Sequence, residues 1–292
     1  AAEKAAAEKL EAERIAARKV ELAQSAYDAG LSEELAQKFA DNNVEISESD
    51  LDTELANFIN DEVIDAKGGY YSSGFSQRNG GVSSASSVST SIINGSVRKY
   101  GQERKSYSYE KIYNQPYSVV IGGGMVDELT TYSGYYSSSN IDKTFSLSKI
   151  AGLVTQDHAI PAIGSATYIG NAMNAAGALG NLSYTIDFGT RKGFGEISGL
   201  SSSDASADIL AVSPISLLEG TLAKINLNGQ SVTGIRGVAR AGDGDAWGYQ
   251  NGTYSLGLFG PKAEEVAGSA LFDGVGDDGK IGFGGQRGEI SK

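Results

Sequence analysis

Residues Gly252-Thr-Tyr-Ser-Leu-Gly-Leu-Phe-Gly-Pro-Lys-Ala-Glu-Glu-Val-Ala-Gly268 contain the pattern that decides the fold. Apolar and small residues alternate from Thr253 to Phe259, which predicts a β-strand. Gly260 and Pro261 predict a tight connection, because glycine permits a close bend and proline fixes φ. A second strand is expected from Val266. We therefore assign the connection to fold specification rather than to binding.

The same alternation continues through the C-terminal half of the chain, where eight alternating segments are separated by turn residues. Eight antiparallel strands favour a closed up-and-down barrel, because closure removes exposed strand edges. An eight-stranded barrel is filled by side chains or holds one small ligand. The predicted strands are Ala166–Ile169, Leu182–Phe188, Gly193–Ile197, Leu222–Leu227, Ser231–Ile235, Thr253–Phe259, Val266–Phe272 and Lys280–Phe283.

A second β-rich region precedes this barrel. Tyr107–Tyr113 and Tyr117–Ile121 are strand candidates, and Pro116 between them marks a turn or an edge. The glycine content differs between the β-rich regions and the N-terminal region, because 38 of the 39 glycines come after Gly30.

Residues 1–66 are predicted to form a helical spacer or a small helical module. The first run repeats Ala, Glu and Lys up to Gly30, a composition typical of a solvated helix with a glycine at its C-terminal end. Ser32 is expected to cap a second helix that ends at Asn42. A cap near Ser49 is expected to start a third helix, with apolar residues at helical spacing.

Composition excludes several classes of function. The chain has 24 basic and 36 acidic side chains, which argues against nucleic acid as a partner. It contains no cysteine, so a thiolate metal site and a cysteine nucleophile are excluded. His158 is the single histidine, so a Ser/His/Asp triad would depend on it alone. No catalytic residue is predicted, and an enzyme would require carboxylate pairs that converge in the barrel.

No metal site is predicted. Residues 243–248 begin like a calcium loop, but the ligand set is incomplete, and residues 273–279 read as a turn between the last two strands. The sequence also shows no secretory signal, no apolar run of about 20 residues and no cysteine for lipidation. If the protein is exported, this numbering starts after processing.

Two motifs at the two ends of the predicted barrel carry a family resemblance. Residues 252–268, followed by Gly282-Phe-Gly-Gly-Gln-Arg287, resemble the C-terminal signature of the transferrin-binding protein B-like β-barrel. Ile160-Pro-Ala-Ile-Gly-Ser-Ala-Thr-Tyr-Ile-Gly170 is similar to the Pro-x-x-Gly-x-Ala-Thr-Tyr-x-Gly start of its first strand. The family includes factor H-binding proteins, haemophilins and other Slam-dependent surface lipoproteins, and the resemblance covers about residues 105–292.

The resemblance implies a β-rich handle over residues 67–155 and an eight-stranded antiparallel barrel over residues 156–292. The helical residues lie outside it, so the whole chain is expected to be mainly β with a helical N-terminal extension over residues 1–66. It also implies a bacterial cell-surface lipoprotein, with the lipidated cysteine outside this sequence, or a secreted protein. Export would use a Slam-type outer-membrane translocator, the type XI route, and the partner would be a host protein or another host surface component.

Haem capture is the alternative that the resemblance leaves open. Haemophilins hold haem near the junction of handle and barrel through a histidine axial ligand, and His158 stands directly before the predicted barrel. Tyr113, Tyr117 and Met125 are secondary ligand candidates, although both tyrosines also fit ordinary strand packing. A haem carrier of this kind would deliver haem to an outer-membrane receptor. Otherwise no cofactor is expected.

The stretch Thr130-Thr-Tyr-Ser-Gly-Tyr-Tyr-Ser-Ser-Ser-Asn140 is a candidate binding loop for a host macromolecule. Tyrosine provides large, stiff contact area, and small polar residues adjust around it. Tyr132, Tyr135 and Tyr136 are the residues that we expect to contact the partner, and the competing interpretation is a flexible serine-rich hairpin. The leading hypothesis is a non-enzymatic host-binding protein, with a haem carrier and an adhesin-like colonisation factor as alternatives.

Overall fold

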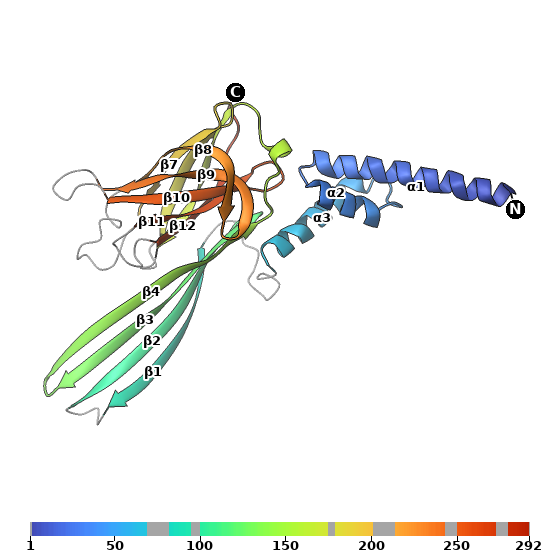
Figure 1. Ribbon diagram of the computed structural model, residues 1–292. Helices are drawn as coiled ribbons and strands as arrows, with labels where there is room; N and C mark the ends of the chain where they lie inside the picture. The colour runs from blue at the N-terminus through green and yellow to red at the C-terminus, as the bar shows by residue number, and fades with distance from the viewer. Residues whose placement is uncertain are drawn as a thin grey trace.

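The computed structural model describes residues 2–68, 82–94, 100–174, 179–200, 214–242, 250–272 and 280–291. Helices lie at the N-terminus, a four-stranded sheet follows, and a closed barrel of eight strands ends the chain (Figure 1). This order confirms the predicted fold class. In the described part of the chain, no helix combines the length and the apolar character that crossing a membrane requires.

Three helices make up the N-terminal helical unit: α1 (Ala2–Asp28), α2 (Glu33–Asn42) and α3 (Leu51–Ala66). Ser32 caps α2 as predicted, because its hydroxyl accepts a hydrogen bond from the Leu35 amide at 3.2 Å. The cap expected near Ser49 falls on the next residue, which makes no side-chain capping bond. Asp50 is the N-cap of α3, and Ser49 instead bonds to the Ser47 hydroxyl at 2.8 Å.

The first half of α1 projects from the rest of the molecule (Figure 1). Residues 3–14 are all exposed, and Leu10 keeps 70% of its surface. Only the C-terminal half of α1 has an apolar face that packs, on α2 and α3. The core of the helical unit contains Leu22, Ala26, Leu31, Ala36, Phe39, Ala40, Leu55 and Val63.

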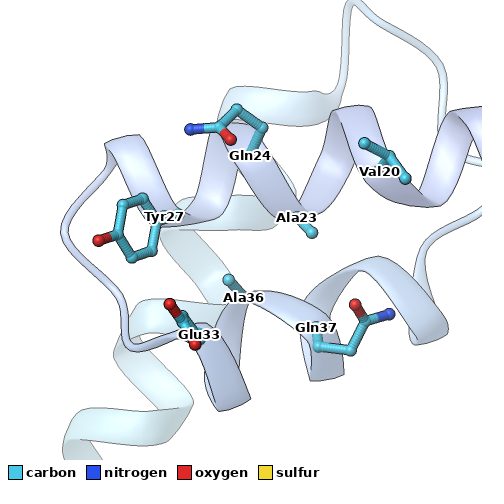
Figure 2. Close-up of a pocket in the computed structure, with 7 residues that line it drawn as sticks. All are labelled: Val20, Ala23, Gln24, Tyr27, Glu33, Ala36 and Gln37. Carbon is cyan, nitrogen blue, oxygen red and sulfur yellow. The ribbon is translucent and has the colours of Figure 1, made fainter.

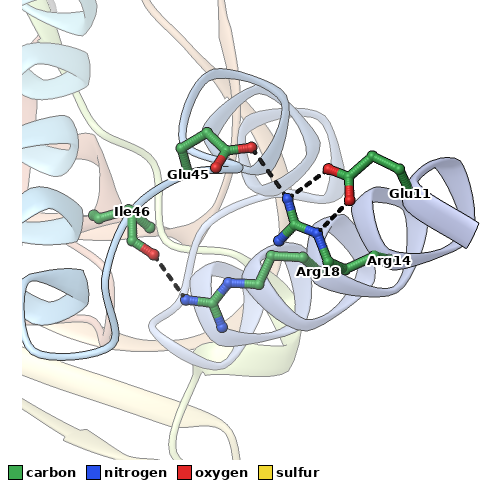
Figure 3. A network of polar contacts seen from close by, with 5 residues as sticks. All are labelled: Glu11, Arg14, Arg18, Glu45 and Ile46. Carbon is green, nitrogen blue, oxygen red and sulfur yellow. Dashed lines mark hydrogen bonds and ion pairs between the residues drawn. The ribbon is translucent and has the colours of Figure 1, made fainter. Parts of the chain in front are cut away.

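Two arginines fasten α1 to the segment that joins α2 and α3 (Figure 3). Arg14 pairs with Glu11 at 2.8 Å and with Glu45 at 3.4 Å. Arg18 donates a hydrogen bond to the carbonyl oxygen of Ile46 at 3.2 Å. Because the Arg14 pairs are solvent-exposed, they contribute little stability, and the apolar face carries the packing.

The handle is an antiparallel meander of β1 (Val82–Asn94), β2 (Tyr100–Asn114), β3 (Ser118–Ser133) and β4 (Tyr136–Gly152), in that order across the sheet. The predicted strand Tyr107–Tyr113 lies within β2, and Tyr117–Ile121 overlaps the start of β3, at the end of the sheet that meets the barrel. Both strands are much longer than predicted, because pairing continues in register through residues without apolar alternation, as far as Tyr100 opposite Ser133.

The barrel closes through antiparallel pairing of its first strand with its last. Its strands are β5 (Ser165–Asn174), β6 (Leu179–Asp187), β7 (Lys192–Ser198), β8 (Ile215–Leu227), β9 (Gln230–Ala241), β10 (Gln250–Phe259), β11 (Glu265–Phe272) and β12 (Lys280–Arg287). Each predicted strand overlaps one of them. Strand β8 begins earlier than predicted, because an irregularity between Leu217 and Thr221 interrupts its alternation.

Buried side chains fill the barrel. Tyr184 and Tyr254 meet inside it, with their hydroxyl oxygens 2.9 Å apart, and Tyr254 also donates to the carbonyl oxygen of Leu218 at 2.6 Å. Glycine in the strands makes room for these rings, since a β-carbon on Gly237 would lie 2.4 Å from the ring of Tyr254. An eight-stranded barrel is either filled by side chains or holds one small ligand, and this barrel is filled by side chains.

Candidate functional sites at the handle tip and the junction

The tip of the β3–β4 hairpin presents two exposed tyrosines. Gly134 and Tyr135 form a two-residue turn, and Gly134 has φ of 67°, as the first central position of a type II′ turn requires. Tyr135 is fully exposed, and Tyr136 keeps 82% of its surface. The handle holds this tip far from the barrel and from the helical unit (Figure 1).

The third predicted residue, Tyr132, has a different environment. Its hydroxyl donates a hydrogen bond to Glu103 at 2.8 Å, and this bond raises the pKa of Tyr132. It is half-buried and held across the sheet on β2. The structure thus brings Tyr135 and Tyr136 together at the tip and makes Tyr132 a support for the hairpin.

The side chains around the tip are mostly small and polar. Residues 133–141 are all exposed, and the hydroxyl oxygens of Thr130 and Ser139 lie 2.9 Å apart across the hairpin. Ile141 adds an exposed aliphatic side chain. Two stiff aromatic rings beside serines and an asparagine can contact a protein surface through both apolar area and hydrogen bonds.

His158 lies in the short 3₁₀-helix η1 (Asp157–Ala159), where it contacts the end of α1. Its ring stacks on the ring of Tyr27, with centroids 3.7 Å apart and planes 12° apart. Its Nε2 lies 2.9 Å from the carbonyl oxygen of Tyr27. Asp157 does not contact this ring, because it bonds Thr233 at 2.5 Å and Lys224 at 2.8 Å, and the bond from Lys224 lowers the pKa of Asp157. His158 therefore joins the helical unit to the start of the barrel.

The other haem-ligand candidates lie in packing environments of their own. Tyr113 is buried where the handle meets the barrel, and this burial raises its pKa. Tyr117 is half-buried and packs against the cores of both the helical unit and the handle–barrel contact. Met125 lies in β3, and its side chain is outside the described residues. The haem ligand set stays a prediction.

The helical unit contacts the barrel through backbone atoms of Gly30 and Pro261. Gly30 has φ of 100°, and a β-carbon there would lie 2.0 Å from the carbonyl oxygen of Pro261. The amide of Gly260 in turn donates to the carbonyl oxygen of Leu153 at 2.8 Å, and Leu153 packs in the core of the helical unit. The connection after Phe259, which we assigned to fold specification, is thus also the platform for the helices.

Three parts of the chain meet at a buried polar contact, which we call the three-way junction: Lys67 after α3, Gln115 and Ser118 around the β2–β3 loop, and Glu265 at the start of β11. Lys67 Nζ donates to Asn114 Oδ1 at 3.0 Å and to the carbonyl oxygens of Gln115 and Pro116. Burial lowers the pKa of Lys67 to about 8 and raises that of Glu265 to about 7. The sequence did not reveal this junction, because Glu265 was assigned with the rest of residues 252–268 to the fold and Lys67 lies in no recognisable motif.

A shallow groove of about 460 Å³ runs between α1 and α2 (Figure 2). Val20, Ala23 and Ala36 form its apolar floor, and Gln24, Glu33 and Gln37 surround it. Tyr27 closes one end with the ring that stacks on His158. The groove is therefore continuous with the contact between the helical unit and the barrel.

Acidic side chains and His158 do not assemble a metal site in the part of the chain that the structure describes. Residues 243–248 and residues 273–279 lie outside the described residues.

Residues 158–270 match the family model described as "Factor H binding protein, C-terminal". Two solved structures are also similar to the chain. Isotype 1 transferrin binding protein B from serogroup B Neisseria meningitidis is 16% identical, with a TM-score of 0.32, over 62% of this chain and 35% of that one. Intact Ap-TbpB, with N and C lobes, is 16% identical, with a TM-score of 0.35, over 70% of this chain and 39% of that one.

The chain thus spans well under half the length of either structure. The family-model match covers β5 to β11 nearly completely, which is the region that the two sequence motifs enclose. The resemblance predicted from those motifs is confirmed for the barrel, because residues 158–270 are similar to the C-terminal part of factor H binding protein.

Proposed function

We propose that this protein is a non-enzymatic bacterial surface or secreted protein that binds a host protein. The observation that carries the proposal is the match of the barrel to a family model named for the binding of factor H. Barrels of one fold serve different ligands, so the contact must be argued from the exposed side chains of this chain.

The handle tip is the contact surface in this proposal. Tyr135 and Tyr136 are the largest exposed side chains among the handle residues whose side chains the structure describes, and the two-residue turn fixes the backbone beneath them. Tyrosines are enriched in the few residues that dominate protein–protein affinity. Because the tip lies away from the barrel and the helices, a large partner can reach it without displacing either (Figure 1).

Surface plasmon resonance on the purified protein tests this proposal, with host factor H and host transferrin as the first two probes. The Tyr135→Ser/Tyr136→Ser double variant is expected to bind at least about 30-fold more weakly, the effect of losing a hot spot of about 2 kcal/mol. Phe194→Ser is the matched control, because Phe194 is a 57% exposed aromatic residue on the outer face of β7. Equal affinity of the double variant and the wild type would contradict the role of the tip.

Export belongs to the same proposal. Delivery to the cell surface by a Slam-type translocator predicts that surface labelling of intact cells detects the protein only when the translocator gene is present. A colonisation role without a soluble partner predicts instead that neither probe binds while attachment to host tissue depends on the protein.

Haem transport is the separate alternative, and it depends on His158. It predicts a sharp Soret band when haemin is added to the purified protein and loss of that band in His158→Ala. Absence of the band in the wild type would end this alternative and leave host-protein binding untouched.

A further inference from the structure

The three-way junction contains two buried ionisable groups that the proposed function does not use. Glu265 keeps 1% of its surface exposed and Lys67 keeps 5%. Glu265 belongs to the barrel, whereas Lys67 follows the helical unit, and the loop between β2 and β3 contacts both of them. Their state therefore affects how all three parts of the chain are held together.

The hydrogen bonds of the three-way junction leave one buried acceptor oxygen without a donor. The carboxylate of Glu265 accepts the Tyr117 amide at 3.1 Å on each oxygen and the Ser118 hydroxyl at 2.8 Å on Oε2. The same Ser118 hydroxyl accepts Gln115 Nε2 at 2.9 Å, and Nε2 also donates to the carbonyl oxygen of Val266 at 3.1 Å. Among the described residues, Gln115 Oε1 is buried with no hydrogen-bond partner. A buried acceptor without a donor is costly, so the junction lacks one donor.

Glu265 is the acidic group of the junction that can gain a proton and thereby add a donor to it. Glu265 and Gln115 share the Ser118 hydroxyl, so the carboxyl and the unsatisfied amide lie on the same small cluster. Oε2 accepts both the hydroxyl and the Tyr117 amide, whereas Oε1 accepts the amide alone, so Oε1 is the oxygen with more room for a proton. A neutral carboxyl also avoids the cost of keeping a charge out of water.

The charged and titratable groups around Glu265 come from each neighbouring element. Lys67, beyond α3, favours the carboxylate, and so do the bonds from Ser118 and Tyr117, yet burial outweighs them and raises the pKa of Glu265 to about 7. Tyr113 of β2 and Tyr117 have pKa values that burial raises, so both stay neutral. Glu264, next in the chain, acts on Tyr117, and Lys149 of β4 donates to the carbonyl oxygen of Lys67 at 2.7 Å.

We propose that Glu265 is a proton-operated latch that holds the helical unit and the handle on the barrel more firmly in mildly acidic than in neutral solution. The closed junction binds a proton at higher pH than the open one does. Its added stability is therefore complete below the ordinary pKa of 4.5 and is lost as the pH rises through about 7.

Hydrogen exchange on the full chain tests the latch at pH 5.5 and pH 7.5. The reporters are the amide of Tyr117, which donates to Glu265, and the amide of Gly260, which donates to the carbonyl oxygen of Leu153 beyond β4. Their protection factors, corrected for the intrinsic rate at each pH, are expected to be about 20-fold higher at pH 5.5. Equal protection at the two pH values would overturn the proposal.

Two variants show whether Glu265 is the group responsible. Glu265→Gln keeps the size, is always neutral and always carries a donor, so its protection is expected to be high and equal at both pH values. Glu264→Gln removes the neighbouring charge and is expected to keep the step. A step that persists in Glu265→Gln would overturn the proposal. If that variant does not fold, the ¹³C titration of the Glu265 carboxyl in the wild type decides, because a midpoint near the ordinary 4.5 also overturns it.

Discussion

Gly30→Ala should detach the helical unit from the barrel. Gly30 ends α1 with φ of 100°, and an alanine β-carbon there would lie 2.0 Å from the oxygen, 2.7 Å from the carbon and 3.0 Å from the α-carbon of Pro261. These are backbone atoms, so no side chain can rotate away. The turn after α1 would have to move back from the barrel, and the contact between Tyr27 and His158 would separate with it.

The expected loss is the sum of a local and a contact contribution. Positive φ costs alanine about 1–2 kcal/mol, whatever surrounds it. Loss of the Tyr27–His158 stack and hydrogen bond adds about 1–3 kcal/mol. Gly229→Ala is the matched control, because Gly229 has φ of 90° and nothing within 4 Å of its missing β-carbon. The difference between the two variants therefore measures the contact alone.

Urea unfolding followed by circular dichroism at 222 nm measures this difference, because the described α-helices all lie in the helical unit. Gly30→Ala is expected to lower the free energy of unfolding of the helical unit by about 1–3 kcal/mol more than Gly229→Ala lowers that of the barrel, to whose β8–β9 turn Gly229 belongs. Equal shifts in the two variants would refute the claim that the helical unit is docked through Gly30.

Three further substitutions probe other contacts. His158→Ala should cost the helical unit about 1–3 kcal/mol in the same urea assay, less than the total for Gly30→Ala, because it removes the stack and one hydrogen bond but adds no positive-φ cost. Tyr184→Phe should cost the barrel about 1 kcal/mol in thermal unfolding, since it removes one buried hydroxyl and leaves Tyr254 its bond to a carbonyl oxygen. Lys67→Met tests the basic group of the junction. Burial lowers the pKa of Lys67 from 10.5 to about 8, so the unfolded state binds more protons than the folded state between these two pH values. The free energy of unfolding of the wild type should therefore rise with pH from about 8 to 10.5. A variant that shows the same rise would assign it to another group.

The barrel could be predicted from the sequence because its information is local. Alternation with period two marks each strand, and the Gly260-Pro261 connection marks where one ends. The handle was predicted only where it is apolar, near Tyr113 and Val120, because the outer residues whose side chains the structure describes are half-buried or exposed and carry no such alternation. Its length follows from pairing between strands, which a single segment does not reveal.

The docking of the helical unit could not be predicted for a different reason. Tyr27 is the one tyrosine and Gly30 the one glycine in residues 1–67, and these two residues make the contacts with His158 and Pro261. Their rarity was the available signal, but the sequence does not say which distant residues they meet. Glu265 poses the same problem, since only the fold shows that it is buried while Glu264 beside it is partly exposed.

The most direct measurement for the account as a whole is hydrogen exchange of the full chain with and without host factor H, and in parallel with host transferrin. The proposal predicts that the binding partner protects residues 133–141 at the handle tip and leaves the outer face of β5 to β7 unchanged. Protection on the barrel or on the helical unit with an unchanged tip, or no protection by either probe, would contradict it.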